Sequence, residues 1–89
     1  TLTFDGLVVA RTEVGASAGY RFQGVIENVD GTTALIGTPT VTTLGEDVSA
    51  WDVSVSANDT SDSLVITVTG AASTTIRWVA TLETAEVAW

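Results

Sequence analysis

The chain has 89 residues, 45% of them hydrophobic, with three arginines, no lysine and eleven carboxylates, giving a formal net charge of −8. This length predicts one domain with a single core, and the absence of cysteine and histidine excludes disulfides, the usual zinc sites and the Ser-His-Asp and Cys-His catalytic arrangements. So acidic a chain is not expected to bind nucleic acid or an anionic membrane, because both require clustered Lys and Arg.

Apolar and polar residues alternate through most of the chain without a helical period, which predicts an all-β protein. In the first half, Asp5-Gly6 and Asp30-Gly31 are predicted turns. Gly24 is expected to mark a bulge or a close approach, and Pro39 an edge or a bulge, because proline has no N–H for a ladder. The predicted strands of this half are residues 1–4, 7–14, 20–29, 32–36 and 40–44.

In the second half, residues 48–57 form a predicted strand that ends at a polar cluster, residues 58–62. Residues 62–89 predict a β-hairpin, with a turn at residues 70–73 between two strands. Seven to eight strands in a single domain, residues 1–89, predict an antiparallel, jelly-roll-like β-sandwich. The candidate core residues are Phe22, Ile26, Trp51, Val53, Val55, Leu64, Ile66, Val68, Ile76, Trp78 and Leu82.

Carboxylate pairs are the remaining candidates for catalysis. Asp59 with Asp62, or Glu46 with Asp47, have the chemistry of an acid and a base. Both pairs lie in predicted turns, however, where Asp is favoured because its side chain bonds nearby backbone. The cluster at residues 58–62 also presents oxygens at alternate positions, as calcium loops do, but it lacks the glycine and terminal glutamate of an EF-hand. We therefore expect no enzymatic activity, no metal and no cofactor.

The last predicted strand carries apolar residues on its second face, which suggests contact with another subunit. The candidate subunit interface consists of Val79, Ala85, Val87 and Trp89. A bulge after Leu82 that changes the register is an alternative explanation of the same pattern. Trp89 is also the candidate aromatic for binding a ligand, whereas Trp51 and Trp78 fall on apolar faces and are expected in the core.

Five segments, residues 7–12, 18–28, 31–38, 50–57 and 69–80, resemble a family of small β domains in bacteriophage virion proteins, especially tail-fibre and related structural proteins. The most specific part is TIRWVA at residues 75–80, followed by Glu86 and Val87. The resemblance implies a non-enzymatic fibre, spike or capsid decoration module at the virion surface. Such a module would act in assembly or host attachment, as a homo-oligomer, with a trimer favoured, together with other virion proteins. The alternatives are a carbohydrate-binding module for a host surface glycan and, third, a small glycosidase using a carboxylate pair.

Overall fold

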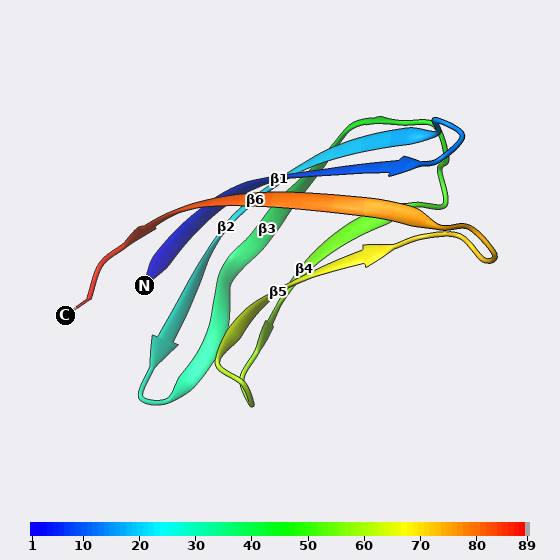
Figure 1. The fold of residues 1–89 in the computed structure, drawn as a ribbon. Coiled ribbons are helices and arrows are strands. Elements are labelled where there is room, and N and C mark those ends of the chain that lie inside the picture. The colour runs from blue at the N-terminus through cyan, green and yellow to red at the C-terminus, as the bar shows by residue number, and fades with distance from the viewer. Residues whose placement is uncertain (89) are drawn as a thin grey trace.

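The computed structural model describes residues 1–88, and this part of the chain contains six β-strands and no helix (Figure 1). A four-stranded antiparallel sheet has the order β3-β2-β1-β6, and β4 and β5 form a separate two-stranded sheet. The all-β, antiparallel class is therefore confirmed, with six strands in place of seven or eight. The strands are β1 (Leu2–Thr12), β2 (Ser17–Val29), β3 (Thr32–Glu46), β4 (Asp52–Asn58), β5 (Ser63–Thr69) and β6 (Ile76–Glu86).

The predicted turn at Asp5-Gly6 is wrong, because β1 runs through these two residues as a continuous strand. Gly6 lies opposite Phe22 on β2, and the Phe22 ring covers the position that a side chain at Gly6 would occupy. Phe4 and Gly24 form the reciprocal pair: the ring of Phe4 lies over Gly24, with Cζ 2.6 Å from the site of a Cβ. The two phenylalanine rings have centroids 6.1 Å apart. Both glycines are therefore required by packing on one face of the sheet.

The predicted break around Pro39 is a bulge inside a single long strand. Gln23 pairs with Thr40 but Val25 pairs with Ile36, so residues 37–39 of β3 lie opposite Gly24 alone. The prediction of a bulge at Gly24, with proline at an edge or bulge, is confirmed, since β3 is also an edge strand. A proline there is tolerated because the ladder is already interrupted.

The predicted hairpin of residues 62–89 is wrong in its pairing, although both of its strands exist. β5 pairs with β4, whereas β6 pairs with β1 from Leu2 opposite Glu86 to Thr12 opposite Ile76. Residues 70–75 therefore connect the two sheets. Beyond the ladder, the Thr1 ammonium donates to the Val87 carbonyl at 3.0 Å, and the Val87 N–H donates back to the Thr1 carbonyl at 2.9 Å. Alternation reveals the two faces of a strand but not its partner.

The core lies between the two sheets, and aromatic rings fill much of it. Tyr20, Trp51 and Trp78 meet there, with the Trp78 centroid 6.4 Å from that of Tyr20 and 6.1 Å from that of Trp51. Buried hydrophobic residues from β1, β2 and the region of β4 surround them. The buried hydrophobic residues are Phe4, Val8, Ala10, Ala18, Tyr20, Phe22, Ile26, Trp51 and Val53.

Nine of the candidate core residues lie in or against this core. Phe22, Ile26, Trp51 and Val53 are buried, and Val55, Leu64, Ile66, Ile76 and Trp78 are partly buried against it. Val68 and Leu82 are 40% and 49% exposed, so their assignment to the core is wrong. The sheets contact each other mainly through β4, which packs on β3 and β2. Val68 and Leu82 lie further along β5 and β6, beyond the residues of these strands that pack against the core.

Candidate functional site

The first candidate acid–base pair anchors the tip of the β4–β5 hairpin to the start of β3. Asp59 Oδ1 accepts a hydrogen bond from the backbone N–H of Thr33 at 2.7 Å, and Asp62 Oδ1 accepts one from the Thr33 hydroxyl at 2.9 Å. The Asn28 amide donates to the same hydroxyl at 2.9 Å. Thr33 is 7% exposed, so these bonds satisfy both the backbone N–H and the hydroxyl of a buried residue. Asp59 and Asp62 therefore both hold the two sheets together.

The second candidate pair fixes the opposite end of the molecule. Glu46 Oε2 accepts a hydrogen bond from the Tyr20 hydroxyl at 2.8 Å, and Asp47 Oδ2 accepts one from the backbone N–H of Ser17 at 2.7 Å. Burial of the phenol raises the pKa of Tyr20 to about 12, and the neighbouring Glu46 carboxylate adds to this shift. Like the first pair, these carboxylates accept hydrogen bonds that stabilise the fold. Within residues 1–88, no three His, Cys, Asp or Glu side chains gather in a way that could hold a metal ion.

The tryptophans that the structure describes belong to the core. Trp51 is 2% exposed, and Trp78 is partly buried and stacked on Tyr20. Trp89, the terminal aromatic proposed for an interface or a ligand, lies outside the described residues. A sugar that stacks on a protein needs an exposed aromatic ring. Trp51 is buried and Trp78 is packed against the core, so neither forms such a platform.

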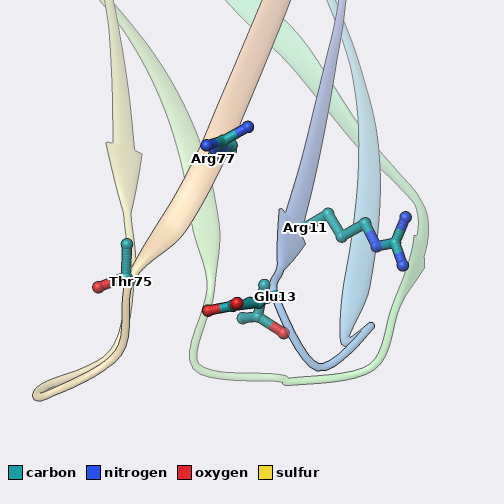
Figure 2. A pocket seen from close by; sticks show the side chains of 5 residues that line it. Arg11, Glu13, Thr75 and Arg77 are labelled. Carbon is teal, nitrogen blue, oxygen red and sulfur yellow. The ribbon is translucent and has the colours of Figure 1, made fainter.

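Two arginines share a pocket at one end of the four-stranded sheet (Figure 2). Arg11 on β1 and Arg77 on β6 are directly opposed in the ladder, and Glu13 and Thr75 complete the rim of a pocket of about 420 Å³. Figure 2 shows the Arg11 side chain extending away from Arg77. Like charges directly opposite each other destabilise a sheet. Among the described residues, neither arginine makes a salt bridge.

The third arginine is paired on the same face. The Arg21 guanidinium donates to Asp5 from Nη2 at 2.8 Å and from Nε at 3.1 Å, across β1 and β2. This bidentate bond to Arg21 lowers the pKa of Asp5 and raises the pKa of Arg21.

An apolar patch lies on the outer face, which is the face of the four-stranded sheet turned away from β4 and β5. Val9 and Val79 are opposed in the ladder and are 55% and 61% exposed, and Leu7 on the same face is 52% exposed. Isolated exposed apolar residues are ordinary, but this patch is contiguous across the two neighbouring strands β1 and β6. We call these three residues the outer patch.

The residues of the candidate subunit interface do not all lie in one place. Val79 lies in the outer patch, and Ala85 lies further along the same face, opposite Thr3. Val87 follows the end of β6 and is 65% exposed. Leu7 and Val9 were missed by sequence reasoning, although their spacing placed them on the side opposite Val8. The sequence signal for this face is the alternation of Leu7 and Val9 with Val8 in the predicted strand of residues 7–14.

The folded chain has a larger solvent-accessible area than a compact monomer of the same mass. Its accessible area is 5901 Å², whereas a compact folded monomer of this mass exposes about 4900 Å². Its radius of gyration is 14.6 Å, against about 12 Å expected for a compact domain of this length. The excess of about 1000 Å² is similar to the area that each partner buries in a standard protein interface, about 800 Å².

Comparison with known proteins finds no matching family model, no matching curated protein and no matching solved structure. In the part of the chain that the structure describes, no helix has the length and apolar character needed to cross a membrane.

Proposed function

We propose that this chain is a non-enzymatic structural module that assembles through the outer face of its four-stranded sheet. The observation that carries the proposal is the outer patch: Leu7, Val9 and Val79 are each more than half exposed on the neighbouring strands β1 and β6. The accessible area, larger than that of a compact monomer, also supports it. The two candidate carboxylate pairs are engaged in bonds that hold the fold, which favours a structural role over a catalytic one.

The proposed setting is the virion surface, as part of a fibre, a spike or a capsid decoration, with other virion proteins as partners. This part of the proposal is supported by the resemblance of five segments that cover about half of the chain. In the same proposal the domain is an incomplete β-sandwich of jelly-roll type, in which a two-stranded layer covers part of a four-stranded one. Incomplete cover of this kind suits a module whose remaining surface is buried by assembly.

The mass of the protein in solution tests the assembly proposal. Light scattering after size-exclusion chromatography, from micromolar to millimolar concentration, should give a mass that rises above 9.2 kDa. Val79→Asp should lower that mass, because it places a charge in the outer patch of an already acidic chain. Val14→Asp is the matched control, since Val14 is 94% exposed and lies in the turn after β1. A strictly monomeric wild type, or equal effects of the two variants, would contradict the proposal.

Two controls accompany this measurement. Val79→Thr keeps the β-branched shape and the strand propensity while removing apolar surface, so it separates lost assembly from lost folding. Circular dichroism should show the same strand content for each variant. The virion setting is tested by immunogold labelling of particles from the strain that encodes the chain. Absence of the chain from purified particles would refute that setting alone.

A further inference from the structure

The outer face carries opposite charges at its two ends. Arg11 and Arg77 are opposed at one end, and Asp5 and Glu83 are opposed at the other. Along each strand the two ends are about six residues, or roughly 20 Å, apart. The outer patch lies between them, so along β1 and β6 the face has a positive end, an apolar centre and a negative end.

We propose that a second copy of this chain occupies the outer face, turned over by a two-fold axis that lies in the interface and runs perpendicular to the strands. This inference rests on the proposed assembly function. The axis passes at the level of Val8 and Ala80, which are paired in the ladder and lie midway between the charged ends. Rotation about it superposes the level of residue 11 on that of residue 5, and the level of residue 77 on that of residue 83. The positive end of each copy then faces the negative end of the other.

The geometry of packed sheets permits these contacts. Two sheets pack face to face about 10 Å apart with their strands rotated by about 30°. At about 10 Å from the axis, that rotation displaces a residue sideways by about 5 Å, which is close to one strand spacing. An arginine side chain spans this displacement, so Arg77 of one copy reaches Glu83 of its partner. The same axis brings the Leu7 level of one copy to the Val9 level of the other, so the outer patches cover each other.

The distribution of charge favours this occupant over other proteins. Arg11 and Arg77 make no salt bridge within residues 1–88, although Glu13 lies beside them and offsets part of their charge. At the other end, Asp5 is already bound to Arg21, whereas Glu83 has no salt bridge among the described residues. Glu83 is therefore the main acceptor for the arginines of the partner. Arg77 of each copy thus pairs with Glu83 of the other, so the same surface is complementary to itself, as an isologous interface requires.

The outer face is also large enough for a stable pair. Eleven residues of β1 and four strands span roughly 36 Å by 19 Å, a footprint of about 700 Å². A standard interface buries about 800 Å² on each partner. The face is thus close to the size needed, and it is comparable to the excess area of the isolated chain.

Charge reversal at two positions tests the two-fold arrangement. Arg77→Glu places two glutamates against each other in the pair, and Glu83→Arg places two arginines against each other. Each single variant should weaken self-association by about tenfold or more, because the axis repeats the repulsive contact twice. The double variant Arg77→Glu/Glu83→Arg should restore the wild-type association, and so should an equimolar mixture of the two single variants. Sedimentation equilibrium gives the mass and dissociation constant, with about twice 9.2 kDa expected for the pair.

The outcomes separate this inference from the proposed function. A wild type that stays monomeric overturns both. A wild type whose assembly is lost in Val79→Asp but unchanged by the charge reversals, or not restored in the double variant, overturns the two-fold pair and leaves the assembly surface standing. A trimeric mass, as the resemblance implies, also overturns the two-fold pair. Residues 77 and 83 are exposed, so each variant is expected to fold, and thermal unfolding of each variant checks this.

Discussion

Replacing Gly6 by alanine tests whether glycine is required inside β1 by packing and not by a turn. A Cβ at this position would lie 2.6 Å from Cε1 of Phe22 and 2.6 Å from the carbonyl oxygen of Thr81. The ring of Phe22 can shift, but the Thr81 carbonyl belongs to the backbone of β6 and is held in the ladder with β1. Alanine at Gly6 therefore pushes the sheet apart where its central strand meets an edge strand.

The expected loss of stability follows from two opposing effects. Overpacking of this kind costs about 1–3 kcal/mol, and the backbone contact places Gly6→Ala in the upper part of that range. Alanine also restricts the unfolded chain, which offsets about 0.4–1 kcal/mol. We expect a net loss of about 2 kcal/mol, and since each kcal/mol shifts Tm by about 4–8 °C in a domain of this size, a fall in Tm of about 8–16 °C.

The assay is urea unfolding followed by tryptophan fluorescence, at one fixed protein concentration because assembly changes apparent stability. Gly45→Ala on β3 is the matched control, since nothing lies within 4 Å of its Cβ position. It should leave the stability unchanged or raise it by up to about 1 kcal/mol. In the double variant Gly6→Ala/Phe22→Leu, the alanine should cost less than in the wild type, because the ring is gone. Equal stabilities of Gly6→Ala and Gly45→Ala would refute the packing argument.

Three further predictions concern the buried polar groups. Tyr20 is the single tyrosine, so tyrosinate absorbance should titrate with a pKa of about 12 in the folded protein, and a midpoint near 10 would contradict the buried bond. Because the unfolded phenol loses its proton first, stability should fall by roughly 2–3 kcal/mol between pH 10 and 12, and Tyr20→Phe should remove this slope. Thr33→Val should cost about 1–3 kcal/mol in urea unfolding, because it leaves Asp62 without its donor, whereas the exposed neighbour Thr32→Val should change little. Trp51→Phe should change the free energy of unfolding by no more than about 1 kcal/mol, because the indole Nε1 is buried without an acceptor among the described residues. Trp51→Ala should lower this free energy by about 3–5 kcal/mol. Similar losses for the two variants would contradict this prediction.

The sequence predicts the strand faces well, because alternation with a period of two depends only on local spacing. Trp51 and Val53 were placed inward on this basis, and both are buried. Turns were predicted less well, because Asp5-Gly6 has the local chemistry of a turn while packing against Phe22 keeps it in a strand. Tertiary contacts override local preference at such positions.

Strand partners could not be predicted, and the candidate site depends on them. Val79 and Ala85 were identified from the apolar second face of the last strand, and they share the outer face. The alignment of Val9 with Val79, and of Arg11 with Arg77, becomes visible only when β6 is placed beside β1. A strand with alternating apolar and polar residues can pair with many different strands. The charge pattern across two paired strands therefore cannot be predicted from the sequence of either strand alone.

The pairing of β1 with β6 also governs the order in which the sheet can form. β2 and β3 follow β1 closely in the chain, so these three strands can associate through local turns. β6 comes last, and non-local pairing of this kind slows folding because a long loop must close first. Until β6 arrives, β1 is an edge strand with unpaired backbone groups, and an open edge is a template for pairing with other chains. Pairing with β6 therefore covers the free edge of β1, and a delay in this pairing would prolong the exposure of that edge.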